Sequence, residues 1–371
     1  MKESIKNFED SVDKQVNIIS YTTFMIDTFG NVSPDNNDLH NLFLTFLKAG
    51  KTEYSQFIYN GIIVSLYGSF ERLIEDIVES YLTSIICHSD TFEKLPSAIK
   101  KNHTELSLAL ALKVGKDRNR EIEEKSKLQS VIISNLNTCM INKDGYKLNV
   151  SAFSSHTANF RLDIVRETFS NIGLSSIIDD LANNIEVIDF VRAEKGYGEG
   201  ENVTNNEVAS TIRFKLDDLA NRRNEIAHGT KPQNYLDYNL LLSFCEFMKI
   251  IGKAIYTSCS TSNNRVRLKN IDLSHYDTVY MNNPKVFIKP GVIGFKIEDV
   301  TGLSGFNLKV GTKIFITNNN DEIQSEATLV SLIVNKSDAN EYLISEAFEF
   351  GIKLDIPLEN SFSRRKFFFY N

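Results

Sequence analysis

The sequence predicts an α+β protein in two parts: an N-terminal all-helical bundle followed by a small β-rich domain of the barrel or sandwich type. Only three of the six prolines (Pro34, Pro96 and Pro232) precede residue 260, which leaves long stretches free to be helical. Apolar residues in that region recur at helical spacing. After about residue 262, short β-branched and alternating runs divided by Gly, Asn and Pro replace this pattern. We therefore place the helical domain at 1–260 and the β-rich domain at 262–371.

The predicted helices follow one another along the first part of the chain. The first covers about 7–29 and ends at a cluster of turn residues, and the second covers about 55–86 with a continuous apolar stripe. Residues 90–150 are charged and mixed, which is typical of an inserted solvated helix or loop. The later elements are two short helices separated at Gly173, a glycine-rich surface loop at 194–205, and helices at 206–227 and from 235 to about 258.

Composition restricts the classes of function. There are 41 Lys and Arg against 48 Asp and Glu, for a net charge of −7, so bulk charge does not favour nucleic acid and any such role needs a local site. The four cysteines form no Cys-x-x-Cys pair and the six histidines form no His-Glu-x-x-His pair, so we expect neither a disulfide framework nor a metal or other cofactor. The polar N-terminus and the lack of a long apolar run predict a cytoplasmic protein with no membrane association.

One predicted helix carries unusual chemistry near its end, just before Gly229. Its apolar face contains an arginine, Arg223, and arginine is almost never buried unless it is paired, so its position calls for a carboxylate, a phosphate or a cleft. A purely structural alternative is that Arg223 extends to the edge of the face while His228 caps the last helical carbonyls. The apolar face comprises Ile212, Leu216, Leu219, Arg223, Ile226 and Ala227, and a polar stripe of Asp217, Asn221, Asn224 and His228 runs beside it.

The string Arg223-Asn224-Glu225-Ile226-Ala227-His228 has the form R-N-x-x-x-H. It resembles the motif of the HEPN superfamily, in which helical domains serve as toxins, defence ribonucleases and CRISPR effector nucleases. The segment 64–82, with Phe70 and Glu71, is similar to the early core helix of these proteins, and 157–174 is similar to a segment of the RiboL-PSP-HEPN and related groups. The resemblance covers most of residues 1–260 and says nothing about residues 262–371.

The resemblance implies a metal-independent endoribonuclease acting in toxin or anti-phage defence or in stress response. Arg223 would hold the scissile phosphate and His228 would transfer a proton, while the substrate 2′-hydroxyl attacks to give a 2′,3′-cyclic phosphate and a 5′-hydroxyl. The chemistry suits these residues, because histidine titrates near neutral pH and a guanidinium is a permanent phosphate ligand. Asn224 would orient His228 or contact the phosphate. Glu71 is a supporting candidate that could pair with Arg223 or Arg222, with a surface salt bridge as the alternative.

One histidine cannot easily serve as both base and acid, so the resemblance also implies a homodimer or a higher symmetric oligomer. RNA is the expected substrate, and an antitoxin or another defence-system protein is an expected partner. Lys231 is a candidate contact to RNA backbone, although loop exposure explains it equally well. Arg364, Arg365 and Lys366 precede four aromatic residues, a composition suited to single-stranded nucleic acid. The alternative, which we favour, is a last β-strand that packs its aromatics inward.

Two other classes of function remain open. The chain could be a HEPN module that binds RNA or a nucleotide without cutting it, or an interaction subunit of a defence complex. It could also be a structural helical adaptor, in which case Arg223 and His228 would matter only for stability.

Overall fold

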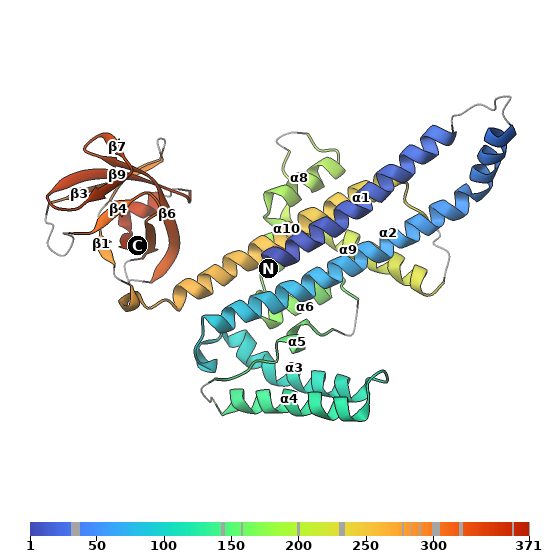
Figure 1. Ribbon diagram of the computed structural model, residues 1–371, viewed down its shortest axis with the longest axis horizontal. Coiled ribbons are helices and arrows are strands. Elements are labelled where there is room, and N and C mark those ends of the chain that lie inside the picture. Colours follow the sequence, from blue (N-terminus) through green and yellow to red (C-terminus); the bar gives the residue numbers. More distant parts are fainter. Residues whose placement is uncertain are drawn as a thin grey trace. The chain divides into compact units, whose positions relative to one another are not determined.

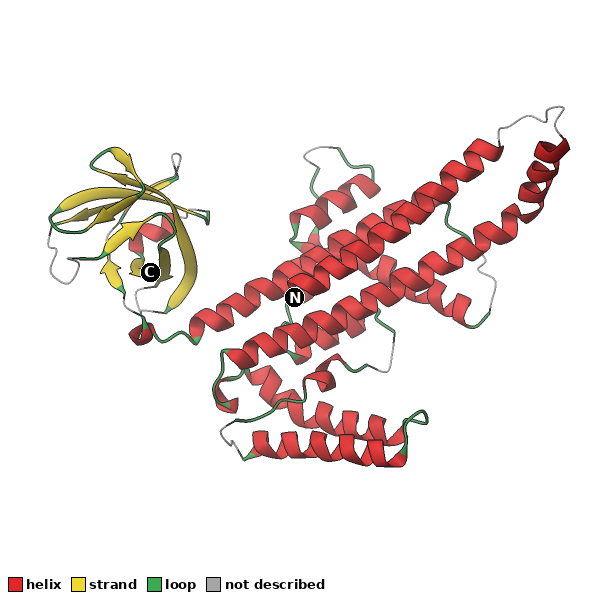
Figure 2. Ribbon diagram, viewed as in Figure 1, coloured by secondary structure: helices red, strands yellow, loops and turns green. Residues whose placement is uncertain are grey.

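The computed structural model describes residues 1–30, 38–141, 145–156, 159–198, 201–229, 234–276, 278–282, 284–288, 291–298, 305–318, 322–357 and 360–370. The chain forms two compact units, Met1–Ser262 and Asn263–Asn371. The described part of the first unit is helical, whereas the strands lie in the second (Figure 2). The chain passes from one unit to the other inside a helix, α10 (Tyr238–Lys269).

Three long helices form the frame of the first unit: α1 (Lys2–Gly30), α2 (Asp38–Cys87) and α10 (Figure 1). They approach closely at Gly252 of α10, where a Cβ atom would lie 2.6 Å from the ring of Phe8 on α1 and 3.1 Å from Leu73 on α2. Glycine is therefore required at this crossing. The buried stripe of α2 is the predicted one, and consists of Ile62, Leu66, Phe70, Leu73, Ile77 and Tyr81.

Shorter helices surround this frame. The predicted insertion contains α3 and α4, which pack side by side, followed by α5 against α2 (Figure 1). His103, which the sequence places in a polar, charged stretch, is instead completely buried on α3. The bounds are α3 (Ser97–Lys116), α4 (Ile122–Met140), α5 (Val150–Ser154), α6 (Leu162–Asn171), α7 (Ile177–Ala182) and α8 (Ile185–Glu194), with a short 3-10 helix at Phe92–Lys94.

The motif lies on α9 (Asn205–Ala227), which packs against α2, α6, α7 and α8. A capping box starts the helix: the Thr204 hydroxyl accepts from the Glu207 backbone N–H, and the Glu207 carboxylate accepts from the Thr204 N–H. Gly229, at φ +69°, ends it, because this left-handed conformation favours glycine after a helix. The helix therefore delivers its last turn, with the motif, to a fixed place beside α2.

The second unit is a curled antiparallel sheet in the strand order β1-β10-β5-β6-β9-β3-β2, with β7 added to β6 and a separate β4-β8 pair. Its core is aromatic, and Phe367 and Phe369 of the last strand are completely buried, as expected for a strand that packs its aromatics inward. The bounds are β1 (Val279–Met281), β2 (Lys285–Phe287), β3 (Val292–Ile297), β4 (Asn307–Lys309), β5 (Lys313–Thr317), β6 (Ile323–Val334), β7 (Ser337–Ala339), β8 (Glu341–Leu343), β9 (Phe348–Leu354) and β10 (Lys366–Tyr370); two 3-10 turns lie at Leu273–His275 and Asn360–Arg364.

Several helix ends differ from those that the sequence predicts. The second helix begins at Asp38 rather than near 55, and α10 continues to Lys269 instead of ending near 258. The polar end of α10 is helical because Leu268 packs against Phe315 and Ile323 of the sheet, a contact that periodicity alone does not reveal. The predicted turn at 31–37 lies outside the described residues. None of the described helices is long and apolar enough to cross a bilayer.

Candidate functional site

Arg223 lies at the edge of the α9 apolar face, where its guanidinium covers the ring of Tyr67 on α2. The guanidinium carbon is 5.1 Å from the ring centroid, a cation–π contact. Its NH1 group donates to the side-chain oxygen of Asn224 at 3.2 Å. Among the described residues no carboxylate forms an ion pair with Arg223. The side chain is thus held by a ring and one amide, and most of its five N–H donors remain available to a ligand.

The guanidinium of Arg222, the preceding residue, is already hydrogen-bonded to other groups of the protein. Its Nε donates to Asp218 at 2.7 Å, and its NH1 donates to the Tyr59 hydroxyl at 2.8 Å and to the backbone oxygen of Asn234 at 2.6 Å. These contacts tie α9 to α2 and to the start of the segment that leads to α10. Arg222 therefore has a structural role on the neighbouring face, and we find no contact between it and Glu71 among the described residues.

Asn224 connects the motif to the segment before α6. Its Oδ1 accepts from Asn159 Nδ2 at 3.1 Å, and Asn159 Oδ1 in turn accepts from the Tyr67 hydroxyl at 3.3 Å. The same hydroxyl accepts from the backbone N–H of Phe160 at 3.0 Å. Tyr67 is 2 % exposed, so this network fixes the ring on which Arg223 rests.

Glu71 lies one helical turn after Tyr67 and contacts a histidine rather than an arginine. Its Oε1 is 2.9 Å from His156 Nε2 and accepts from the Tyr67 hydroxyl at 3.3 Å. The other ring nitrogen of His156, Nδ1, is 3.3 Å from the Ser154 backbone oxygen and 3.6 Å from Glu75. The expected pairing of Glu71 with Arg223 or Arg222 is thus replaced by a pairing with His156.

His228 is exposed at the end of α9. Its backbone N–H donates to the Asn224 carbonyl at 2.9 Å, which completes the last turn. Its imidazole has no hydrogen-bond partner within the part of the chain that the structure describes, so it does not cap the helix carbonyls. The ring is therefore free to contact a substrate or another chain.

Burial and charge perturb two groups of the network. Burial raises the pKa of Tyr67, and the Glu71 carboxylate raises it further, whereas the hydrogen bond from Phe160 and the charge of Arg223 lower it. Burial also raises the pKa of Glu75, although His156 opposes this. Tyr67 therefore stays protonated at neutral pH, and its single hydroxyl proton is shared between two acceptors, the Glu71 carboxylate and the Asn159 side-chain oxygen.

The remaining predicted residues lie elsewhere. Lys231 is outside the described residues. Arg364 ends a 3-10 turn and Lys366 begins β10, so these cations and Arg365 belong to the second unit, separate in the chain from the motif. No group of His, Cys, Asp or Glu suited to a metal occurs in the described ranges.

Sequence reasoning missed three members of the site: Tyr67, Asn159 and His156. Tyr67 has the period of the buried α2 stripe and reads as core. His156 gains its role from Glu71, which is 85 residues away in the chain. One feature of the sequence could have indicated this part of the site. Tyr67, Glu71 and Glu75 are spaced four residues apart, so their side chains lie on one face of the same helix.

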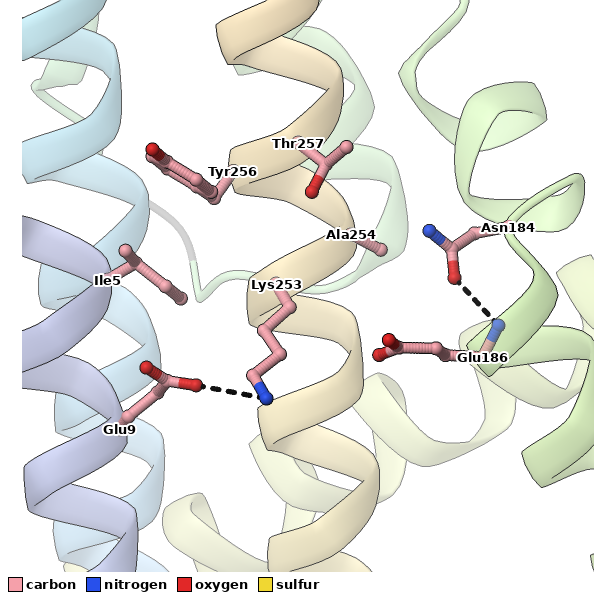
Figure 3. Close-up of a pocket in the computed structure, with 8 residues that line it drawn as sticks. All are labelled: Ile5, Glu9, Asn184, Glu186, Lys253, Ala254, Tyr256 and Thr257. Atoms are coloured by element: carbon pink, nitrogen blue, oxygen red, sulfur yellow. Dashed lines mark hydrogen bonds and ion pairs between the residues drawn. The ribbon is translucent and has the colours of Figure 1, made fainter. Parts of the chain in front are cut away.

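Cavities in the first unit lie away from the motif. One of about 310 Å³ is formed by α1, α8 and α10; Glu9 and Lys253 form an ion pair at 3.2 Å in its wall, and the Asn184 side chain caps the start of α8 (Figure 3). A cavity of about 340 Å³ lies between α1 and α2, one of about 630 Å³ between α1 and α10, and one of about 620 Å³ between α8 and α10. Arg223 and His228 line none of these four cavities in the described structure; Arg223 is half-buried and His228 is exposed.

The sequence model of the RiboL-PSP-HEPN family matches residues 35–261, and this stretch contains the whole constellation described above. The chain therefore belongs to the RiboL-PSP-HEPN family, as its resemblance to HEPN proteins predicts. Membership connects the chain with RNA, as a nuclease or as a binding module. No curated protein matches the chain, and no solved structure does.

Proposed function

We propose that the protein is a metal-independent endoribonuclease whose site is formed by Arg223, Asn224 and His228. The observation that carries the proposal is the state of Arg223: it is fixed on Tyr67 and Asn224 without a carboxylate partner among the described residues. A positioned guanidinium with free donors is a ligand for the scissile phosphate, and stabilises the charge that develops on it.

His228 supplies the proton transfer. The 2′-hydroxyl of the substrate attacks the adjacent phosphorus and loses its proton, the P–O bond to the 5′-oxygen breaks, and that oxygen gains a proton. The products are a 2′,3′-cyclic phosphate and a 5′-hydroxyl. Histidine is suited to either proton transfer near neutral pH. Because one exposed imidazole serves one of the two transfers, the second is assigned to His228 of another copy of the chain.

The test is cleavage of an end-labelled RNA oligonucleotide by the purified full-length protein in excess EDTA. We expect Arg223→Ala and His228→Ala each to reduce the rate at least about 100-fold. Arg118→Ala, in the exposed turn between α3 and α4, and His275→Ala, in the second unit, are matched controls and should retain activity. An RNA with a single 2′-deoxy substitution at the cleaved position should resist cleavage there.

Other outcomes point to other functions. If the wild-type protein binds the RNA but cuts nothing, it is a binding module, and Arg223→Ala should then weaken binding. If neither variant changes binding or cleavage while both lower the melting temperature, the helical end is structural. A role in defence or stress response predicts growth arrest on expression that Arg223→Ala relieves, and a partner that restrains the enzyme should co-purify with it.

A further inference from the structure

The Glu71 carboxylate contacts His156 and also accepts from the hydroxyl of Tyr67. The ring of Tyr67 supports the Arg223 guanidinium, so a negative charge lies near the arginine of the motif without pairing with it. The side chain of Glu71 is 28 % exposed and that of His156 is 19 % exposed. Both are therefore withdrawn enough from water for their pairing to matter more than a surface ion pair.

Hydrogen-bond acceptors surround both ring nitrogens of His156. Nε2 faces the Glu71 carboxylate, and Nδ1 faces the Ser154 carbonyl and the more distant Glu75 carboxylate. All of these groups are acceptors, so a ring N–H of His156 has a partner on either side, and at Nε2 that partner is the Glu71 carboxylate. The other charged groups nearby are Glu79, which accepts from the Ser154 hydroxyl at 2.7 Å, and Lys113, which donates to the His156 carbonyl at 3.1 Å.

Glu71 and Arg223 both contact Tyr67, one at its hydroxyl and the other at its ring. Glu71 accepts from the Tyr67 hydroxyl, while Arg223 covers the Tyr67 ring, and both charges influence that phenol. A carboxylate and a guanidinium that share a partly buried residue attract each other strongly, and a bidentate pair is their preferred arrangement. An ion pair between Glu71 and Arg223 would occupy the N–H donors of Arg223 that, in the proposed function, bind the phosphate.

We propose that His156 is a positioning residue that sequesters Glu71, and that it thereby keeps the Arg223 guanidinium free for the phosphate. With His156 removed, Glu71 retains only the Tyr67 hydroxyl as a described partner and turns toward Arg223. The predicted effect of His156 on RNA binding rests on the proposed function. The effect of His156 on the pairing of Glu71 does not depend on any activity of the protein.

The first experiment measures the state of Arg223 without RNA. Phenylglyoxal modifies exposed, unpaired guanidinium groups, and peptide mass spectrometry locates the modified residue. We expect Arg223 to react in the wild-type protein, to react at least about 5-fold more slowly in His156→Ala, and to recover in the double variant His156→Ala/Glu71→Gln. Arg222, already bonded to Asp218 and Tyr59, is an internal control and should react slowly throughout.

The second experiment measures binding of a 2′-O-methyl RNA oligonucleotide, which cannot be cleaved, by fluorescence anisotropy. His156→Ala should weaken binding about 10-fold or more, and the double variant should return to within about 3-fold of wild type. His275→Ala is the control for loss of a histidine far along the chain and should bind as wild type. If His156→Ala does not fold, His156→Gln replaces it, because the amide keeps one N–H donor for Glu71; we expect a smaller effect in the same direction.

The outcomes separate the two proposals. Reactivity that falls in His156→Ala and recovers in the double variant, with no RNA binding by any protein, supports the role of His156 and overturns the proposed function. Equal reactivity of Arg223 in the wild type and in a folded His156→Ala overturns the role of His156, whatever the RNA result. Failure of the double variant to recover, at a melting temperature equal to that of His156→Ala, also overturns it.

Discussion

Arg222 and Arg223 have the same side chain and adjacent positions, but the structure uses them for different purposes. Arg222 is bonded on three sides by Asp218, Tyr59 and the Asn234 carbonyl, whereas Arg223 rests on an aromatic ring. The 100° rotation between successive helical residues causes the difference, because it directs the two side chains to different neighbours. The sequence shows that two arginines are adjacent, but only their packing against α2 determines which of them keeps N–H donors free for a ligand.

Residue environments also explain which histidines can take part in chemistry. His103 is completely buried, its Nε2 accepts from the Asn149 backbone N–H at 3.1 Å, and its ring stacks on Phe153. Burial lowers the pKa of His103 to about 4. The ring is therefore neutral at physiological pH and has a structural function, which its polar surroundings in the sequence conceal.

This environment predicts an acid-sensitive stability. A histidine in the unfolded chain titrates near 6.5, so between pH 6.5 and pH 4 the unfolded state binds a proton that the folded state does not. The free energy of unfolding should therefore fall as pH decreases through this window, by roughly 3 kcal/mol in total. Urea unfolding of the full-length protein at a series of pH values measures this effect.

The comparison variant is His103→Gln, whose side-chain oxygen can accept from Asn149 but does not titrate. Its stability at pH 7 should be lower than wild type, and its dependence on pH between 6.5 and 4 should be flatter. His275→Gln, at an exposed position, should keep the wild-type slope. Equal slopes for wild type and His103→Gln would contradict the assignment.

At the scale of elements, the last turns of α10 belong to the second unit by their packing. Leu268 is 5 % exposed against Phe315 and Ile323, and Arg267 forms an ion pair with Glu326, which also accepts from the Tyr370 hydroxyl. The sequence predicts that the last helix of the first part ends near residue 258, before this stretch. The contacts with the sheet make it part of the fold of the second unit.

We therefore expect a fragment of residues 263–371 to be more stable than one of residues 271–371. Loss of the buried Leu268 side chain and of the Arg267 pairing should reduce the free energy of unfolding by about 2–4 kcal/mol. Thermal denaturation followed by circular dichroism compares the two fragments. Leu268→Ala in the longer fragment should reproduce most of the loss, and Asn264→Ala should have little effect; similar melting of both fragments would show that the α10 end is dispensable.

At the scale of the whole molecule, composition and periodicity were sufficient to predict the α+β class and the change from helices to strands. They succeeded for α2 and α9, whose apolar stripes are long and regular. They were less informative for α1, where the apolar residue Phe24 is 64 % exposed while the polar residues Gln15 and Thr22 are buried. The polar network around Tyr67 could not be predicted, because it joins segments that have no pattern in common.

The exposed position of His228 also supports a prediction about assembly. We expect the full-length protein to sediment as a dimer or a larger symmetric oligomer, because the proposed reaction needs two proton transfers and assigns only one of them to each exposed His228. Analytical ultracentrifugation across a range of concentrations tests this. A fully active monomer at the concentrations of the cleavage assay would rule out the shared site.

The order of the site residues along the chain has a consequence for synthesis of the protein. Tyr67 contacts Asn159, which lies 92 residues later, and Asn159 contacts Asn224, a further 65 residues on. A chain emerging from the ribosome therefore presents the supporting ring and the carboxylate long before the motif exists, and contacts of such long range form slowly. The growing chain cannot acquire the complete constellation until α9 has been made, so a protein that acts on RNA would be assembled beside ribosomal RNA in a form that lacks its site.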